Sequence, residues 1–305
     1  FFGLVYKMDR KDVEDISSLT PDTMIKANPN LGFSIRRSVM QSQIDDVIAS
    51  PVKRRTFLPK RCSIFYANND KSYVDSLDVS DCSPNETLNL DDYLGEDVWL
   101  GFDGSQTLDL TSLSLIFKSK DPACKYDVFS RSFTPENTVK NLPAKYKQMY
   151  LEFAEQDHLT ILDGSRINLT TIFTFIKDLN NKFNIKKFSY DTAGVHSLIE
   201  DLNINCFRRP KEQMLLVPQT LPHINTPARD LQTLIVSHEI RFSDPVLSWA
   251  LANAITAHSG DGKLLRVEKE NAQDKIDPVI ATICGLYPLS GVVSNKKRSF
   301  HSAAL

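Results

Sequence analysis

The stretch that decides the fold is Val98-Trp99-Leu100-Gly101-Phe102-Asp103-Gly104-Ser105, a hydrophobic strand that ends in an acid and a turn. A second apolar run, Leu110-Thr111-Ser112-Leu113-Ser114-Leu115-Ile116-Phe117, follows at once, so the two are predicted to form a hairpin. Asp103 stands at the tip of the first strand, and Asp109 follows six residues later. Carboxylates at such a strand end are candidate ligands of a divalent metal ion.

Two further acids occupy comparable places. Asp191 ends the strand Lys187-Phe188-Ser189-Tyr190, and Asp277 opens the apolar helix Asp277-Pro278-Val279-Ile280-Ala281. The carboxyl edge of parallel strands is where ligand sites form, so Asp191 is the most informative of the four acids. Separated carboxylates at element ends predict a Mg²⁺ or Mn²⁺ site for two-metal phosphoryl transfer.

Each acid also has a plainer interpretation. Asp103 suits a turn that hydrogen-bonds its own backbone, and Asp109 suits a solvated loop. Asp191 suits the N-cap of the next helix as well as it suits a metal. Asp277 alone is better explained as a helix N-terminal charge with Pro278 at the first helical position.

Composition excludes several classes of protein. The 305 residues are 41% hydrophobic and 24% charged, with a net charge of −2, so any nucleic-acid contact must use local positive charge. No apolar run approaches the roughly 20 residues that span a bilayer. Five cysteines without metal-type spacing predict free thiols in a reducing cytosol. The histidines form no metal motif, and the phosphate-loop pattern GxxxxGK[ST] does not occur.

The order of elements predicts an α/β fold, a mixed sheet flanked by helices. A short strand is expected at Phe1–Tyr6, and the start at Phe1 indicates a processed, truncated or partly ordered product. Later strands are expected at 98–103, 110–117, 125–133, 159–162, 185–191 and 204–207, with a hairpin at 263–268. Helices are expected at 35–49, 135–155, 169–182, 194–202, 227–236, 244–257 and 277–287.

The same residues resemble the large terminase subunit of tailed bacteriophages over almost the whole chain. The resemblance rests on Phe1–Tyr6 with Ala27-Asn28-Pro29-Asn30-Leu31-Gly32, on Phe102–Ser105 with Asp109-Leu110-Thr111, on Tyr190-Asp191, and on Lys275-Ile276-Asp277. The segment His258 to Lys269, with Asn253 before it, is similar to the part that precedes the family's last helix. The order and spacing of these short motifs are more specific than any one of them.

The resemblance implies a ribonuclease H-like nuclease that cuts concatemeric viral DNA with two Mg²⁺ or Mn²⁺ ions. It implies that Asp103, Asp191 and Asp277 are catalytic metal ligands, with Asp109 as a fourth or accessory ligand. Residues 1–67 would be the end of an ATPase domain, 68–95 a linker or covering segment, 96–289 the nuclease domain and 290–305 a basic tail. The family's ATPase motifs would lie before Phe1, and Pro278 replaces the small residue that often follows the last acid.

Partners follow from the resemblance and from charge. The family implies duplex DNA, the portal protein and the small terminase subunit as partners, in the host cytoplasm of a phage or prophage, with no membrane. Lys263, Arg266 and Lys269 are expected to contact phosphates, because the family uses a β-hairpin beside its nuclease groove. For Arg208 and Arg209, DNA contact and a solvated surface are equally supported.

Two other functions compete with a terminase nuclease. One is another ribonuclease H-like nuclease, such as a junction resolvase or a transposase, which would lack the Ala27–Gly32 motif. The other is a non-catalytic ribonuclease H-like module that docks the portal or the small subunit. Metal binding among the four acids separates the nuclease from the docking module.

Overall fold

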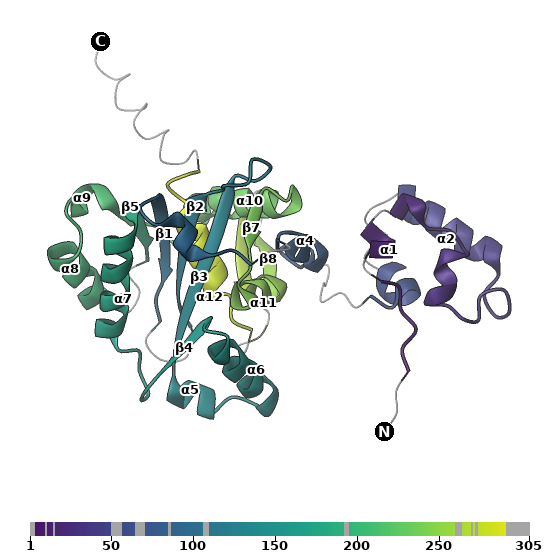
Figure 1. The fold of residues 1–305 in the computed structure, drawn as a ribbon, viewed down its shortest axis with the longest axis horizontal. Coiled ribbons are helices and arrows are strands. Elements are labelled where there is room, and N and C mark those ends of the chain that lie inside the picture. Colours follow the sequence, from purple (N-terminus) through teal and green to yellow (C-terminus); the bar gives the residue numbers. More distant parts are fainter. Residues whose placement is uncertain are drawn as a thin grey trace, which may run out of the picture. The chain divides into compact units, whose positions relative to one another are not determined.

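The computed structural model describes residues 4–9, 11–14, 16–49, 57–64, 71–84, 87–105, 110–191, 195–259, 264–269, 271 and 274–290. The chain divides into two compact units, Phe1–Asn69 and Asp70–Leu305 (Figure 1). Among the described residues, every helix is too short or too polar to cross a bilayer.

The first unit consists of short helices around a small core. Its elements are α1 (Lys11–Glu14), 3-10 helices at Ile16–Ser18 and Thr23–Lys26, α2 (Arg37–Ala49) and a π-helical turn at Leu58–Cys62. The core contains side chains that are at most 2% exposed, including Met8, Met24, Met40, Ile44 and Leu58. The predicted strand at Phe1–Tyr6 is wrong for residues 4–6, which form no strand and expose Leu4 and Val5; residues 1–3 lie outside the described part.

The Ala27–Gly32 turn is hydrogen-bonded to a distant segment of the first unit. The Asn28 side chain is 6% exposed and donates to the carbonyl oxygens of Met24 at 3.0 Å and Arg61 at 2.6 Å. Gly32 adopts φ +96°, a conformation that glycine reaches at no steric cost. The predicted turn is therefore confirmed, and its buried amide ties residues 24–28 to the end of the π-helical turn.

The second unit is built on a mixed sheet with strand order β4-β3-β2-β1-β5-β6, and β7 pairs with β3 beside this path. The pairs β1–β2 and β2–β3 are antiparallel, whereas β1–β5, β5–β6, β3–β4 and β3–β7 are parallel. A separate hairpin pairs β8 with β9. The strands are β1 (Asp97–Asp103), β2 (Thr111–Lys118), β3 (Tyr126–Pro135), β4 (Leu159–Leu162), β5 (Asn184–Tyr190), β6 (Met214–Leu216), β7 (Ile240–Phe242), β8 (Ala254–His258) and β9 (Leu265–Lys269).

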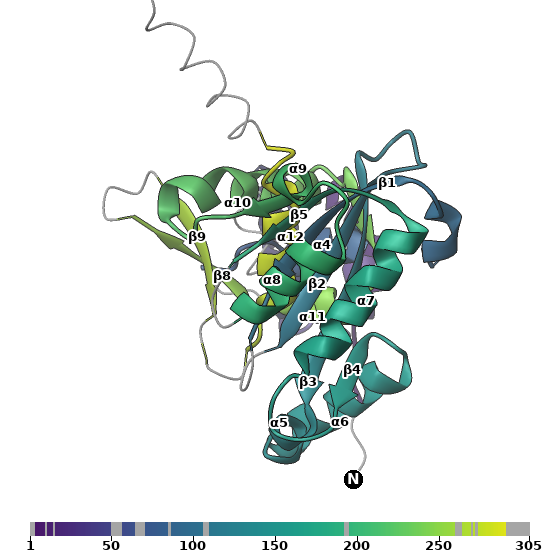
Figure 2. The same ribbon diagram turned by 90° about the vertical axis from the view of Figure 1, so that its left-hand side faces the viewer.

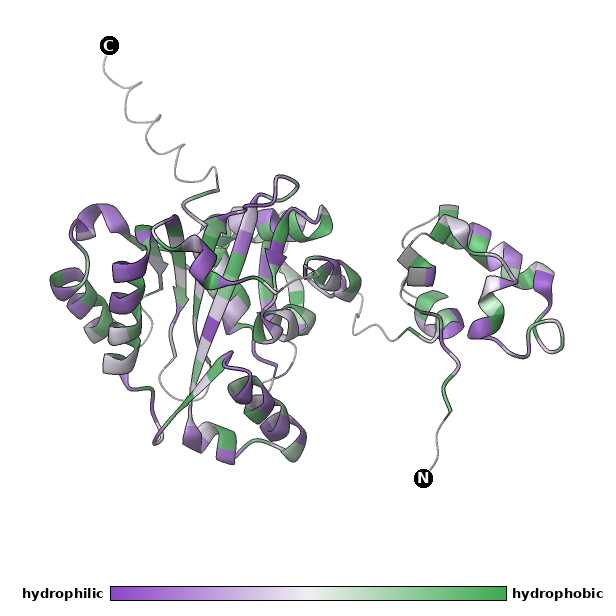
Figure 3. Cartoon of the chain, viewed as in Figure 1, coloured by the Kyte–Doolittle hydropathy of each residue, from purple (hydrophilic) through white to green (hydrophobic). Residues whose placement is uncertain are grey.

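Helices cover both faces of the sheet, as the sequence predicts (Figures 1 and 2). One face packs against α7 and α8, and the other against α10, α11 and α12. In Figure 3 the outer helices carry both hydrophilic and hydrophobic residues, as expected of helices that pack one face against a sheet. The helices are α4 (Ser76–Asp81), α5 (Glu136–Lys140), α6 (Ala144–Glu155), α7 (Leu169–Lys182), α8 (His196–Asn205), α9 (Pro210–Gln213), α10 (Leu221–Val236), α11 (Pro245–Asn253) and α12 (Asp277–Leu286), with a 3-10 helix at Leu90–Tyr93.

The strand predicted at 204–207 is wrong. Helix α8 continues to Asn205, and the strand beside β5 is Met214–Leu216, after the short α9. Ile204 is 74% exposed, while Phe207 is buried with its ring 5.7 Å from that of Phe188. A short apolar run fits a strand and a helix end equally well, so periodicity could not separate them.

The helix predicted at 244–257 is also wrong in its last four residues. Helix α11 ends at Asn253, and Ala254–His258 form β8, whose partner is β9. The expected hairpin at 263–268 is therefore the second strand of a hairpin whose connection includes residues outside the described part. Pairing with β9 overrides local helix propensity here.

Proline explains another difference from the prediction. The helix expected at 135–155 is two helices, α5 and α6, because Pro143 has no N–H to donate and starts the second one. Helix α10 begins at Leu221, six residues earlier than expected, with Pro222 in the first turn where proline is tolerated. The strand at 159–162 and the helix at 169–182 match their predictions residue for residue.

The segment after residue 70 packs onto the second unit. Tyr73 is 1% exposed, its hydroxyl donates to the Ala228 carbonyl, and its N–H donates to the Ala254 carbonyl at 2.9 Å. Tyr93 is buried and donates its hydroxyl to Asp127, which also accepts from Arg241. Residues 71–84 and 87–95 therefore pack against the rest of the second unit, to which they belong.

Helix α12 lies directly on the backbone of β1. A Cβ atom added to Gly101 would stand 1.8 Å from the Ala281 carbonyl oxygen and 2.3 Å from the Gly285 nitrogen. A Cβ added to Gly285 would meet the Gly101 nitrogen at 3.1 Å. Two glycines therefore allow a helix and a strand to approach more closely than any side chain permits.

We predict that Gly101→Ala destabilises the protein by about 3 kcal/mol or more, because the new methyl overlaps backbone atoms that no rotamer change can move. Urea unfolding of the intact chain measures the loss. Gly164→Ala is the matched control, since its φ of +91° brings strain but no atom lies within 4 Å. That control should lose only about 1–2 kcal/mol, and equal losses in the two variants would contradict the close contact.

Candidate metal centre at the carboxyl edge of the sheet

Asp103 and Asp191 end neighbouring strands. Strands β1 and β5 are parallel, with Phe102 paired to Tyr190, and each acid is the next residue along its strand. Adjacent strands lie about 4.8 Å apart, so the two acids stand side by side at the carboxyl edge. The placement of both acids on adjacent strands is confirmed.

Both acids face helix α12. Side chains alternate between the faces of a strand, so Asp103 points to the same face as Gly101, which contacts α12. Ser189 pairs with Gly101, and Asp191 shares its face by the same rule. Phe102 points the other way, into the core beneath α7 and α8.

Asp277 lies on the side of α12 that meets β1. Residues Asp277, Ala281 and Gly285 recur every four positions and therefore share one face of the helix. Asp277 is the first residue of α12, so Pro278 is the second residue and not the first as expected. The Asp277 side chain is 8% exposed, which is unusual for a plain helix-terminus charge, because a buried carboxylate needs a counter-charge or a metal.

Buried hydroxyls fix α12 along the sheet. The Ser114 hydroxyl on β2 lies 2.8 Å from the Thr282 hydroxyl, which donates to the Pro278 carbonyl oxygen at 2.8 Å. Ser114 is also the partner of Gly101 across β1 and β2. The hydrogen bonds and the glycine contact therefore act at the same level of the sheet and set the position of Asp277.

The buried thiol of Cys284 on α12 lies within electrostatic range of both strand-end acids. Burial raises the pKa of its thiol, and the negative charges of Asp103 and Asp191 raise it further. Gln219, in the loop after β6, donates to the Cys284 sulfur at 3.7 Å. Cys284 lies about two helical turns after Asp277 on α12. The sequence prediction missed Gln219, Ser114 and Thr282, which no motif marks.

The three acids do not form a compact cluster of ligand atoms. In the described part of the chain, such a cluster with all ligand atoms within 4.8 Å consists of Asp78, Asp81 and His238. A two-ion site does not require that distance, since ligands on opposite sides of two ions about 4 Å apart are separated by more. Like charges also keep three carboxylates apart until cations neutralise them.

The family model described as "Terminase large subunit, endonuclease domain" matches residues 1–288. The chain belongs to this family. The protein YmfN of Escherichia coli (strain K12) is 24% identical over 290 residues, which cover 92% of this chain and 61% of that protein. The terminase large subunit of Lactococcus phage SK1 is 21% identical over 294 residues, covering 93% and 51%. This terminase chain therefore spans about half to three-fifths of the length of these relatives.

A solved structure supports the fold. The HK97 bacteriophage large terminase matches with a TM-score of 0.60 and 18% identity, over 93% of this chain and 56% of that one. The mixed sheet flanked by helices is the ribonuclease H-like fold of terminase nuclease domains. The predicted family and fold class are confirmed.

The remaining residues that the sequence predicted for the site do not all gather near the acids. Asp109 and Lys263 lie outside the described residues. Arg266 and Lys269 are exposed on β9, and Arg266 forms an ion pair with Glu268 at 3.0 Å. Arg208 and Arg209 follow α8 and line a cavity at the amino end of β5. Asp191 lies at the opposite end of this strand, so the structure does not bring the two arginines together with the acids.

The hydroxyl pair gives a stability prediction. Ser114→Ala and Thr282→Val should each cost about 1–3 kcal/mol, because each leaves a buried hydroxyl or carbonyl poorly satisfied. The double variant should cost less than the sum, since both partners are then apolar. Chemical denaturation of the four proteins measures the coupling, and strict additivity would show that the contact does not hold α12.

Proposed function

We propose that this terminase chain is a divalent-metal-dependent endodeoxyribonuclease that cuts concatemeric duplex DNA during packaging. The observation that carries the proposal is the meeting of two strand-end acids, Asp103 and Asp191, with the α12 face that bears the buried Asp277. Membership of a terminase endonuclease family supports the interpretation of these acids as metal ligands of a nuclease.

The donor set fits Mg²⁺ or Mn²⁺. Carboxylate oxygens suit hard cations, whereas a zinc site would use histidine or cysteine. Asp103, Asp191 and Asp277 would hold two ions, with Asp109 as an accessory ligand. When bound, the ions supply an activated water and neutralise charge on the phosphodiester. The carboxylates orient this chemistry, and the tight α12–β1 contact keeps Asp277 in register with the strand-end acids.

The packaging context extends the proposal. Residues 1–67 would close an ATPase domain that precedes this part, 68–95 would join it to the nuclease domain at 96–289, and 290–305 would be a basic tail. Lys263, Arg266 and Lys269 would contact DNA phosphates from the β8–β9 hairpin. The portal protein and the small terminase subunit would be the protein partners, in the cytoplasm of the host.

We predict that Asp103→Asn, Asp191→Asn and Asp277→Asn each reduce Mg²⁺- or Mn²⁺-dependent cleavage of plasmid DNA by a factor of about 100 or more. Each change removes one ligand charge while preserving side-chain size, so the ions are held less well. Gel assays under single-turnover conditions measure the loss, and a chelator should abolish wild-type cleavage.

The matched control is Asp163→Asn, an exposed acid in the turn after β4, which should cut at the wild-type rate. Cleavage by wild type in excess chelator would refute the metal dependence. A wild type that neither cuts DNA nor gains thermal stability with Mg²⁺ would instead identify a non-catalytic docking module, because a ligand that binds the folded state stabilises it.

A further inference from the structure

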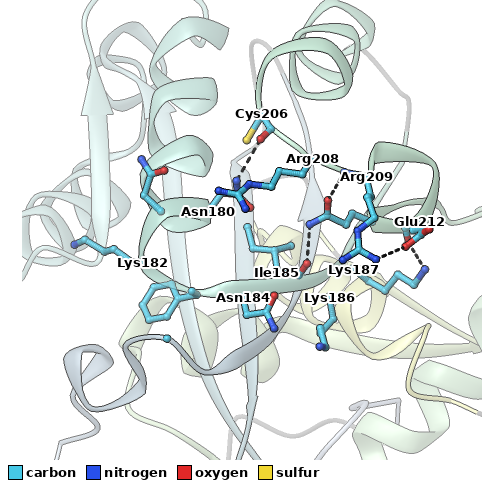
Figure 4. A pocket seen from close by; sticks show the side chains of 14 residues that line it. Asn180, Lys182, Asn184, Ile185, Lys186, Lys187, Cys206, Arg208, Arg209 and Glu212 are labelled. Carbon is cyan, nitrogen blue, oxygen red and sulfur yellow. Dashed lines mark hydrogen bonds and ion pairs between the residues drawn. The ribbon is translucent and has the colours of Figure 1, made fainter.

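A polar cavity lies at the end of the sheet opposite to the acids. Its volume is about 870 Å³, and it is lined by the end of α7, the start of β5 and the segment from Cys206 to Gln213 (Figure 4). Lys186, in the cavity, precedes Asp191 by five residues along β5. A strand rises about 3.3 Å per residue, so the cavity is roughly 17 Å from the acid edge.

The lining is strongly positive. Five cations line the cavity and Glu212 is the single carboxylate among the lining residues; the cations are Lys182, Lys186, Lys187, Arg208 and Arg209. Lys186 pairs with Asp97 at 3.1 Å and Arg209 with Glu212 at 3.2 Å, both on the surface. Among the described residues, no hydrogen bond or ion pair involves the side chains of Arg208 or Lys182, and both are exposed. These two cations are available to a ligand.

The wall that carries the arginines is held in place. The Asn180 amide donates to the Cys206 carbonyl at 3.2 Å, and the Gln213 amide donates to the Ile185 carbonyl at 2.9 Å. The Arg209 N–H donates to the Gln213 side-chain oxygen at 2.9 Å. Buried Phe207 anchors the same segment under Phe188. The arginines therefore stand on a fixed loop, which lowers the entropic cost of binding a ligand.

The chemistry of the lining selects its ligand. Small-molecule sites are mostly apolar, and protein interfaces have apolar centres depleted of charge, whereas this cavity offers cations and amides. Arginine, lysine, asparagine and glutamine are among the side chains that contact DNA phosphates, and a guanidinium matches a phosphate with two hydrogen bonds. An open cavity of this kind fits the backbone of a nucleic acid.

We propose that this cavity binds backbone phosphates of duplex DNA outside the cleaved region. The inference rests on the proposed function, since it names a second contact with the same substrate. Phosphate contacts position a duplex without reading its sequence. The cavity therefore raises affinity for the DNA that extends beyond the cut and leaves the chemical step to the acids.

The test is duplex binding by the whole chain in chelator, where no cleavage occurs. Fluorescence anisotropy with a labelled duplex compares wild type with Arg208→Glu and Lys182→Glu, changes on two different elements. Each should weaken binding about tenfold, as expected for loss and reversal of a phosphate contact, and should lower the slope of log affinity against log salt by about 1. Unchanged thermal unfolding confirms that the variants fold.

Lys147→Glu is the matched control, because it makes the same charge change at an exposed position of α6, outside the cavity. It should change affinity less than twofold at moderate salt, where distant charges are screened to about 10 Å. Equal losses in Lys147→Glu and the cavity variants would overturn the proposal. So would cavity variants that bind DNA like wild type but lose binding to poly-glutamate, since the site would then belong to an acidic protein.

The outcome is separable from that of the proposed function. The loss of cutting in Arg208→Glu should follow its loss of affinity and shrink as the protein concentration is raised. Asp103→Asn should bind DNA in chelator like wild type and should fail to cut it once Mg²⁺ is added. If the wild type binds DNA through Arg208 but never cuts it, the proposed nuclease activity is wrong and the proposed phosphate site stands. If the wild type cuts DNA and Arg208→Glu binds it normally, the proposed phosphate site is wrong and the proposed nuclease activity stands.

Discussion

The contact between Gly101 and helix α12 is the constraint on which the site depends. Because neither Gly101 nor Gly285 has a side chain, the helix rests on the strand backbone, and Asp277 follows from the helical repeat that contains Ala281 and Gly285. Strand alternation then turns Asp103 toward the same helix. A larger residue at either glycine would move the helix away from the sheet, and the carboxylate at its first turn would move with it.

The sheet separates two kinds of electrostatic environment along β5. At its carboxyl end, Asp191 stands beside Asp103 and near a buried α12, an environment that attracts cations. At its amino end, Lys186 and Arg208 belong to a cavity that attracts anions. A duplex that engages both ends would place one phosphodiester at the acids and more distant phosphates at the cations, so affinity and chemistry would be divided between the ends of one strand.

The sequence predicted much of this architecture because the central strands are apolar runs, because α7 has a helical repeat of apolar residues, and because acids at element ends mark an edge. It could not predict that Ala254–His258 would leave the helix to pair with β9, since that strand lies beyond a loop. Nor could it find Ser114, Thr282 or Gln219, because their role arises only when α12 docks. The cations Arg208 and Arg209 were noticed, but their distance from the acids depends on β5 running between them.

The central claim is that Asp103, Asp191 and Asp277 form one metal centre, and anomalous scattering from crystals grown with Mn²⁺ tests it most directly. The account predicts two Mn²⁺ peaks about 4 Å apart, bounded by these three carboxylates. Their loss in Asp103→Asn crystals would confirm the assignment. Crystals that bind Mn²⁺ only at Asp78, Asp81 and His238, or that leave the three acids without metal at saturating Mn²⁺, would contradict it.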